Sequence, residues 1–395
     1  MPSKRIASLT PSATHAMTAR IAQLRAAGEK VFPFHVGEPD FPTPQPIVEA
    51  CVRALAGGMT KYTPTPGILA LREAICEKLE RENGLRYAPE QICVSNGAKQ
   101  ALSNAVLALC DETDEVLIPT PCYLSYPEIV RLAGGVPVPV PTKADFSPDI
   151  GALRAAITPR TRLILLNSPN NPSGAVYSRA SLEAIGALVL EHDLHVISDE
   201  VYEKLVFDGA EHVSIASLSP ELYARTVVVG GFSKSFAMTG WRLGYTASSR
   251  ELCRACDALQ GHMTSCATSF VQAAALAALS DCAGETEAMR REFEARRDEM
   301  HRLLCAMPGI RCALPQGAFY LLPDVSALFG KRANGREIAS AADLCAYLLD
   351  TARVAAVPGD AFCLPGTIRL AYTCPIDVIR EGMARMAKAL EKLED

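Results

Sequence analysis

Five short and almost wholly apolar runs in the middle of the chain restrict its fold more than any other feature of the sequence. Strands that are buried on both faces of a parallel sheet have this composition, whereas strands with one wet face alternate polar and apolar residues. Segments with helical patterns separate several of the runs. This order predicts an α/β domain in which helices cover both faces of a mainly parallel sheet. The runs are 115–118, 163–166, 195–198, 226–229 and 243–246, and the helical segments are 97–110, 123–132 and 178–192.

The chain is too long for a single hydrophobic core, since 395 residues suit two domains better. A turn-rich crossing segment at 33–46 and a long helical region at 250–306 flank the predicted sheet. We therefore expect a large domain at 47–285 and a smaller α/β domain built from both chain ends. Residues 1–46 would form an N-terminal arm and part of that small domain, and residues 286–395 the rest of it.

Composition excludes several classes of partner. The chain has 39 Lys and Arg against 44 Asp and Glu, a net charge of −5, so it has no general attraction to nucleic acid or to an anionic membrane. No apolar run is long enough to span a membrane. The 14 cysteines are scattered, and no secretory signal precedes them, which predicts reduced thiols in a cytoplasmic protein. We expect no metal site: the Cys253/Cys256 pair and the His192/His195 pair are both interpreted as structural.

The segment 230–242 contains a lysine whose setting is unusual. Lys234 lies in a loop of small residues between two predicted buried strands, where a lysine risks losing its hydration. Desolvation lowers the pKa of an amine and makes it nucleophilic toward carbonyl groups, so an aldehyde cofactor would be its natural partner. Taken alone, Lys234 remains compatible with a surface position.

Two further polar groups follow predicted strands. Asp199 ends the run 195–198, at the sheet edge where ligands of open α/β sheets gather. A buried carboxylate there could hold a pyridinium nitrogen protonated, and the alternative is a helix N-cap. Tyr202 lies three residues later and would face the same way. Asn171, between two prolines that stiffen the segment 167–174, would present its amide at the same edge.

The segment 95–100 opens a predicted helix. Free backbone N–H groups at a helix start bind phosphate, and Gly97 and Ala98 allow a phosphate to approach closely. The chain has neither a GxxxxGK[ST] loop nor a GxGxxG motif after a strand. These absences argue against a P-loop nucleotide site and against a Rossmann dehydrogenase.

In this order the segments resemble the class I aminotransferases, which are fold type I pyridoxal-phosphate enzymes. The resemblance is closest to the bacterial aspartate aminotransferase branch and covers nearly the whole chain. It implies a cofactor, pyridoxal 5'-phosphate, and a homodimer with shared active sites. The matching blocks are 11–14, 37–40, 61–62, 171–174, 199–202, 233–242 and 368–372.

The resemblance implies a role for each matching residue. Lys234 would hold the cofactor as a Schiff base and transfer the proton, and Asp199 would pair with the pyridine nitrogen. Asn171 and Tyr202 would bind the ring 3-oxygen, and Tyr123 would stack on the ring face. The phosphate would be bound by Gly97, Ala98 and Arg242, together with Tyr62 of the neighbouring subunit. Gly37 and Arg369 would bind the substrate α-carboxylate. One departure concerns the phosphate, because Gly231 stands where many relatives have a serine, and Ser233 is the possible substitute.

The resemblance also implies a ping-pong transamination between an amino acid and a 2-oxo acid. We expect aspartate or another acidic donor, with 2-oxoglutarate and oxaloacetate as the oxo acids. An acidic side chain needs a second cation besides Arg369, because an unpaired buried carboxylate is costly. The family match indicates Lys99, with Ser12 and Thr14, as this distal site. The alternatives are a carbon–sulfur β-lyase, an aminotransferase for neutral or aromatic amino acids, and a non-catalytic regulator on the same fold.

Overall fold

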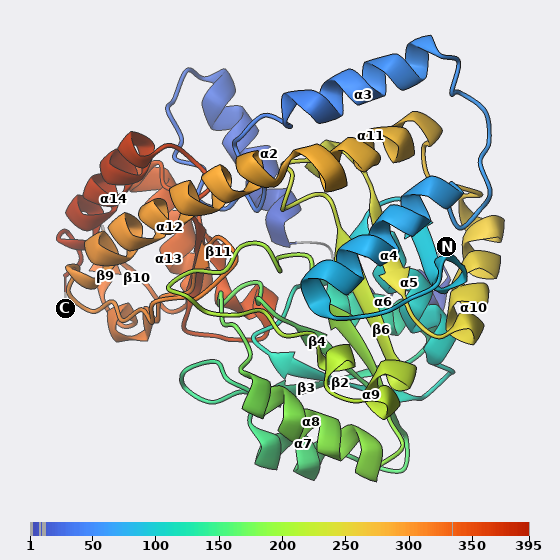
Figure 1. The fold of residues 1–395 in the computed structure, drawn as a ribbon. Helices are drawn as coiled ribbons and strands as arrows, with labels where there is room; N and C mark the ends of the chain where they lie inside the picture. Colours follow the sequence, from blue (N-terminus) through green and yellow to red (C-terminus); the bar gives the residue numbers. More distant parts are fainter. Residues whose placement is uncertain (1–2, 8, 10–12, 334, 395) are drawn as a thin grey trace.

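A seven-stranded sheet forms the centre of the molecule (Figure 1). The computed structural model describes residues 3–7, 9, 13–333 and 335–394, without the side chains of 4, 5 and 13–18. Neighbouring strands are parallel from β6 through β5, β4 and β2 to β3, whereas β7 is antiparallel to both of its neighbours. In spatial order the strands are β1 (Ile92–Ser95), β7 (Gly244–Ala247), β6 (Thr226–Gly231), β5 (His195–Asp199), β4 (Thr161–Asn167), β2 (Glu115–Thr120) and β3 (Val136–Pro141).

The predicted mainly parallel sheet is confirmed, and the side chains of β4 show why its central run 163–166 is apolar. Leu163 and Leu165 pack against α5 (Ala98–Leu109) and α6 (Ser125–Ala133). Ile164 and Leu166 point the other way and pack against α7 (Ile150–Ala156) and α8 (Arg179–Glu191). Successive residues of a strand face opposite sides, so a strand covered on both sides has no polar position.

Two strands of the central sheet were not predicted. β3 alternates valine with proline, and proline cannot donate a ladder hydrogen bond. β3 lies at one end of the sheet, so the nitrogens of Pro137, Pro139 and Pro141 can all face away from its only neighbour, β2. The other missed strand, β1, has four residues and pairs with β7 at the opposite edge.

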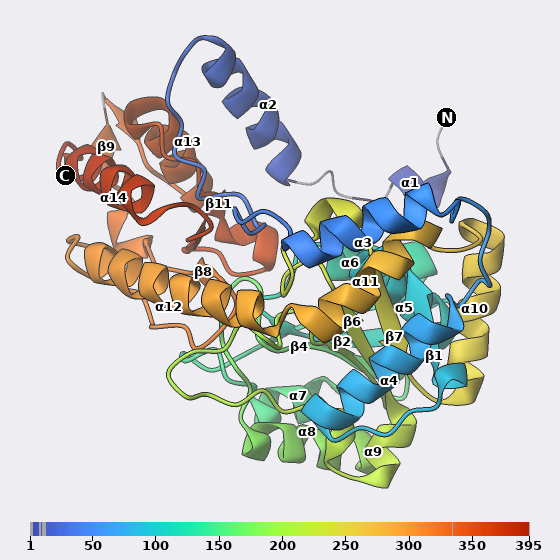
Figure 2. The ribbon, with the colours of Figure 1, turned by 45° about the horizontal axis from the view of Figure 1, so that its top comes forward.

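A second apolar cluster combines both parts of the chain that flank the sheet domain. Phe32 and Phe34 pack with residues between 289 and 390, and Phe32 forms a parallel bridge with Val354. A three-stranded sheet lies within this part: β11 (Val357–Pro358), β12 (Ile368–Ala371) and β8 (Tyr320–Leu321). Figure 2 shows α2 (Ala13–Ala26) beside α13 (Ala341–Ala352), where Ile21 and Leu24 contact Leu349. The expected boundaries at 46/47 and 285/286 stay predictions, and the second falls near the start of α12 (Ala283–Cys305).

The remaining elements connect or cover these two parts. No helix of the described residues is long and apolar enough to cross a membrane. The remaining α-helices are α1 (Lys4–Ala7), α3 (Gln45–Ala56), α4 (Leu69–Asn83), α9 (Pro220–Arg225), α10 (Arg250–Met263), α11 (Ser269–Asp281) and α14 (Ile376–Leu390). The 3-10 helices are η1 (Pro89–Gln91), η2 (Ile215–Ser217), η3 (Thr239–Trp241), η4 (Ser326–Leu328) and η5 (Gly359–Phe362), and β9 (Arg332–Ala333) pairs with β10 (Arg336–Glu337).

Candidate active site

A cavity of about 980 Å³ opens at the carboxyl ends of β4, β5 and β6. Segments from both ends of the chain contribute to its wall together with the central sheet. Most of the residues singled out from the sequence line it: Gly37, Ala98, Lys99, Tyr123, Asn171, Asp199, Tyr202, Ser233, Lys234, Arg242 and Arg369. Gly97 lies directly beside this wall, because it precedes Ala98 and touches the Arg242 side chain.

Asp199 forms part of the inner end of the cavity. It closes β5, where it is paired in register with Asn167 of β4. Its carboxylate accepts a hydrogen bond from the Tyr126 hydroxyl at 2.7 Å and one from the Val201 amide at 3.3 Å. Burial raises the pKa of Asp199 to about 6 despite these two donors. The protein therefore holds a carboxylate that would gain from a cationic partner in the cavity.

Lys234 lies in the loop after β6, and its side chain is partly buried. Its Nζ donates a hydrogen bond to the carbonyl oxygen of Gly37 at 2.7 Å. Burial, together with repulsion from Arg369, lowers the pKa of Lys234 to about 8. A substantial share of the amine is therefore neutral near physiological pH, as a nucleophile toward a carbonyl group requires.

The start of α5 meets Arg242 at one side of the cavity. Gly97 has φ +85°, and a Cβ there would lie 2.5 Å from Arg242 Nη2. A Cβ on Gly244 would collide with the backbone nitrogen of Ala98. Both positions therefore require glycine, and the close approach leaves a helix N-terminus beside a guanidinium, a combination suited to an anion.

A hydrogen-bonded chain of polar side chains forms another part of the cavity wall. The hydroxyls of Tyr202 and Tyr320 share a hydrogen bond of 2.8 Å. Arg369 donates from Nη1 to Asn171 Oδ1 and from Nη2 to the His35 carbonyl oxygen, each at 3.0 Å. The Arg369 guanidinium also lies 4.5 Å from the centroid of the Tyr320 ring, while its buried Nε has no partner among the described residues. The arginine is thus held rigidly and retains hydrogen-bonding capacity.

Several residues of the cavity wall were not predicted from the sequence. Tyr126 and Tyr320 belong to no recognised motif, because only the folded chain brings them to Asp199 and Arg369. Arg25 of α2 also lines the cavity and is exposed. His35 lines it too, and its buried Nδ1 has no partner among the residues described. Burial, with the charges of Arg25 and Arg369, lowers the pKa of His35 to about 4, so the ring is neutral at physiological pH.

Three predicted site residues stand apart from this group. Tyr62 does not line the cavity and is 89% exposed. Ser12 lies outside the described residues. Thr14 belongs to α2, but its side chain is not among those that the structure describes.

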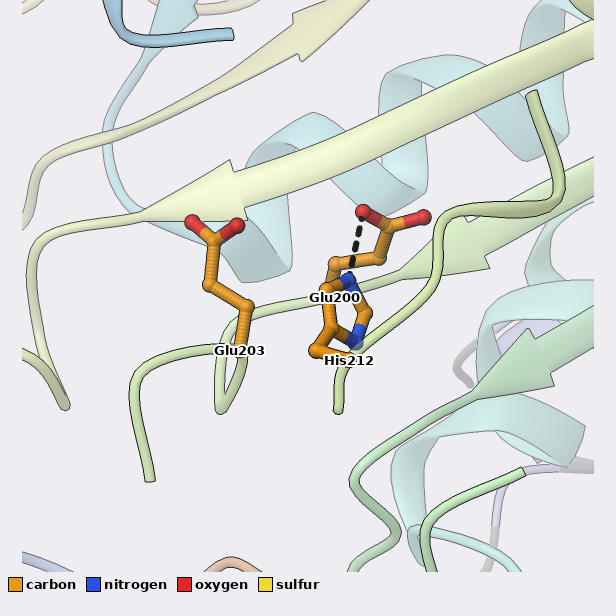
Figure 3. A group of neighbouring side chains, drawn as sticks. All are labelled: Glu200, Glu203 and His212. Carbon is orange, nitrogen blue, oxygen red and sulfur yellow. Dashed lines mark hydrogen bonds and ion pairs between the residues drawn. The ribbon is translucent and has the colours of Figure 1, made fainter. Parts of the chain in front are cut away.

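An ionic cluster follows Asp199 in the chain and consists of the buried Glu200 and the partly buried Glu203 and His212. A carboxylate oxygen of each glutamate and an imidazole nitrogen lie within 4.8 Å of one another (Figure 3). Its charges already have partners within the chain. Glu203 is paired with Lys78, and Glu200 lies 3.1 Å from the His212 Nε2. Burial opposes protonation of His212, but the hydrogen bond and charge of Glu200 outweigh it and raise the pKa of His212. We interpret the cluster as an internal ion-pair network that supports the strand end carrying Asp199.

Comparison with known proteins identifies the family. The family model "Aminotransferase class I and II" matches residues 29–386. An aspartate aminotransferase of Geobacillus stearothermophilus is 46% identical over 98% of each chain, and an aspartate/prephenate aminotransferase of Cereibacter sphaeroides is 44% identical over 97% of each. The crystal structure of the aspartate aminotransferase from Rhizobium meliloti aligns with a TM-score of 0.96 at 41% identity, covering 100% of both chains.

The chain therefore belongs to the class I and II aminotransferase family and has the fold type I architecture. It is a pyridoxal-phosphate-dependent aminotransferase, and its substrates are an amino acid and an oxo acid. The resemblance, the fold class and the cofactor expected from the sequence are confirmed. A carbon–sulfur β-lyase on the same fold is not favoured by these matches.

Proposed function

We propose that this aminotransferase takes its amino group from aspartate or another acidic amino acid and passes it to a 2-oxo acid such as 2-oxoglutarate or oxaloacetate. The observation that carries the proposal is the pair of cations at the mouth of the cavity. Lys99 and Arg25 share the cavity with Arg369, yet neither side chain has a hydrogen bond or ion pair with another described residue. Relatives named as aspartate aminotransferases, at 43–46% identity, support the same substrate class.

The residues of the cavity fit pyridoxal phosphate. When bound, the cofactor supplies a conjugated ring that accepts electrons from the substrate α-carbon. Asp199 would pair with the pyridine nitrogen, because burial raises the pKa of this carboxyl to about 6 despite the charge of Lys234, so a protonated ring nitrogen would stabilise its ionised form. Asn171 and Tyr202 would hold the ring 3-oxygen, and Tyr123 would contact the ring face. The phosphate would be held by Gly97, Ala98, Ser233 and Arg242.

Lys234 is the proposed Schiff-base lysine and the base for the α-proton. Its Nζ is held by the Gly37 carbonyl oxygen, so the amine is directed toward the segment that also borders Arg369. Once displaced by the substrate, the free Lys234 amine would accept the proton from the substrate α-carbon and would donate it two atoms away, which is a 1,3-proton transfer. A pKa of about 8 suits both directions of transfer near neutral pH.

Arg369 is the proposed site for the substrate α-carboxylate. Asn171 and the His35 carbonyl oxygen fix its guanidinium, and the rings of Tyr320 and Phe362 lie 4.5 and 4.8 Å from it. An arginine fixed in this way presents a planar fork that matches a carboxylate with two parallel hydrogen bonds. Gly37 leaves room beside it, because a Cβ there would lie 2.7 Å from the Tyr320 hydroxyl.

Lys99 and Arg25 are the proposed readers of the acidic side chain. Lys99 Nζ lies 5.5 Å from the centroid of the Tyr123 ring, at the start of α5. Arg25 approaches from α2, on the opposite part of the fold. The structural observation therefore adds Arg25 to the cation indicated by the sequence, while Ser12 and Thr14 remain proposals from the family match.

We also propose a homodimer as the active unit. Tyr62 is 89% exposed, which is unusual for a large aromatic side chain in a segment that matches the aminotransferase family. Its proposed role is a phosphate contact in the active site of the second subunit.

An amino-donor screen with 2-oxoglutarate as acceptor tests the substrate class. We expect the highest kcat/KM with aspartate and much lower values with alanine and phenylalanine. A preference for neutral or aromatic donors would reject the acidic-substrate proposal.

Single variants then separate the two cations. Lys99→Ala and Arg25→Ala should each lower kcat/KM for aspartate about ten- to a hundredfold more than for alanine, the value of one charge-assisted contact. Lys143→Ala, which removes an exposed lysine outside the cavity, is the matched control. An equal loss for both donors would show that the substituted residue does not read the side chain.

A further inference from the structure

Two cysteines from distant parts of the chain meet beside the active-site cavity. Cys122 follows β2 and immediately precedes Tyr123, whereas Cys363 follows η5 in the segment that leads into β12 and Arg369. The backbone amide of Cys122 donates a hydrogen bond to the carbonyl oxygen of Phe362 at 3.1 Å. Each thiol shifts the pKa of the other, so the two side chains adjoin. Adjoining thiols on segments whose backbones are joined by a hydrogen bond are favourably placed to form a disulfide.

The two thiols differ in exposure. Cys122 is 2% exposed, whereas Cys363 is exposed. The neighbouring Cys122 thiol, and the charge of Arg131, lower the pKa of Cys363 to about 7 against the effect of burial. The Cys363 thiol, together with burial, raises the pKa of Cys122 well above its ordinary range. An accessible thiol that readily ionises therefore adjoins a protected one, as an attacking cysteine adjoins a resolving cysteine.

We propose that Cys122 and Cys363 form an oxidation site that closes into an intrachain disulfide in the presence of a peroxide. The Cys363 thiolate attacks one peroxide oxygen, the O–O bond breaks, and the departing hydroxide takes up a proton to give water. The Cys122 sulfur then attacks the resulting Cys363 sulfenic acid. Its proton and the departing hydroxide form a second water. Two thiols thus lose two electrons and two protons in total, and one hydrogen peroxide is reduced to two waters.

The disulfide would tie together the two segments that carry opposite groups of the active site. Tyr123, next to Cys122, is the proposed ring-stacking residue, and Arg369, six residues after Cys363, is the proposed carboxylate site. The bond would restrict any movement of one segment relative to the other during turnover. We therefore expect the oxidised enzyme to have a lower kcat, and dithiothreitol to restore it.

The wild-type holoenzyme supplies the main test. It is treated with a small excess of hydrogen peroxide, its free thiols are alkylated, and the non-reduced digest is examined by mass spectrometry. We expect a peptide that joins Cys122 to Cys363 and the loss of two thiols per chain. Cys305 is the internal control, because it is also an exposed cysteine, and its thiol adjoins His301 and the Cys312 carbonyl oxygen. Cys363 should be oxidised at least about threefold faster than Cys305.

Two variants complete the test. Cys363→Ser removes the exposed member and should abolish the linked peptide and the reversible loss of kcat. Cys122→Ser should leave Cys363 as a sulfenic acid that a dimedone probe captures without any linked peptide. Absence of the Cys122–Cys363 peptide in wild-type enzyme under conditions that oxidise Cys305 would overturn the proposal. A linked enzyme with unchanged kcat would refute the coupling to turnover.

Discussion

The inner wall and the outer rim of the cavity differ in how completely the chain satisfies its own polar groups. The inner wall, comprising Asp199, Asn171, Lys234 and Arg369, is hydrogen-bonded within the chain at each of its four residues. The outer rim comprises the exposed cavity residues Lys99 and Arg25. Their side chains, and that of Tyr62 outside the cavity lining, have no hydrogen bond or ion pair with another described residue.

This difference separates two kinds of task. Fixed partners hold the inner wall in one geometry before any ligand arrives, as chemistry on a bound cofactor requires. The charges of the rim and the exposed Tyr62 have no hydrogen-bond or ion-pair partner within the described part of the chain, and their proposed partners are a substrate and a second subunit. Substitutions at the inner wall should therefore affect the reaction itself, whereas those at the rim and at Tyr62 should affect substrate choice and assembly.

The largest effect is expected at Lys234. Lys234→Ala removes both the proposed Schiff-base amine and the proposed base, so transamination should fall below detection. The pH-dependent visible absorbance of the bound cofactor should be lost as well. Wild-type turnover in a steady-state assay of this variant would contradict the role of Lys234.

A smaller but still severe loss is expected at Asp199. Asp199→Ala should leave cofactor binding measurable while slowing α-proton removal about a thousandfold, because no carboxylate then holds the ring nitrogen protonated. Stopped-flow measurement with α-deuterated and α-protiated donor isolates this step. A near-normal kcat would exclude the assignment.

The proposed contact of Tyr62 across the subunit interface is tested by mixing two defective proteins. Tyr62→Ala lacks the proposed contact to the partner's phosphate, and Lys234→Ala lacks the amine. A hybrid dimer contains one site with both groups intact, so random reassociation should recover about a quarter of wild-type activity. Each variant incubated alone is the control. Full activity in a monomer at sedimentation equilibrium would refute the shared site.

The contrast between wall and rim also describes what the sequence could predict. Five strands were located to within a few residues, because β2, β4, β5, β6 and β7 are apolar on both faces. The residues that end those strands, such as Asp199, could be placed on one edge without knowledge of the fold. β3 was missed because its prolines hide a strand that only an edge position tolerates.

Other parts of the site depend on contacts that no local pattern contains. Tyr126 reaches Asp199 from α6, and Arg25 reaches the cavity from α2, near the other end of the fold. The meeting of Cys122 and Cys363 depends in the same way on the packing of the two chain segments. Neither the residue type nor the spacing in the sequence distinguishes these residues from ordinary core or surface positions.

The smallest expected effect concerns the support of the inner wall, and it compares two buried tyrosines. The Tyr126 hydroxyl donates to Asp199 at 2.7 Å, whereas the buried Tyr87 hydroxyl has no partner among the described residues. In apo-protein at pH 8, Tyr126→Phe should lower the free energy of unfolding by about 1.5–3 kcal/mol, since the carboxylate loses a donor. Tyr87→Phe should be neutral or slightly stabilising, because it removes an unpaired polar group.

The pH dependence distinguishes loss of this hydrogen bond from simple loss of packing. The pKa of Asp199 is raised from 3.8 to about 6 in the folded protein, so its protonated form favours folding below 3.8 and this contribution is lost as the pH rises through about 6. Without Tyr126 the folded-state pKa rises further. The penalty of Tyr126→Phe should therefore be present at pH 8, where Asp199 is ionised, and should shrink at pH 5, where it is largely protonated. The effect of Tyr87→Phe should not change between these pH values. Urea unfolding of both apo-variants at pH 5 and pH 8 measures the difference, and an equal penalty for Tyr126→Phe at both pH values would show that its hydroxyl does not stabilise the Asp199 carboxylate.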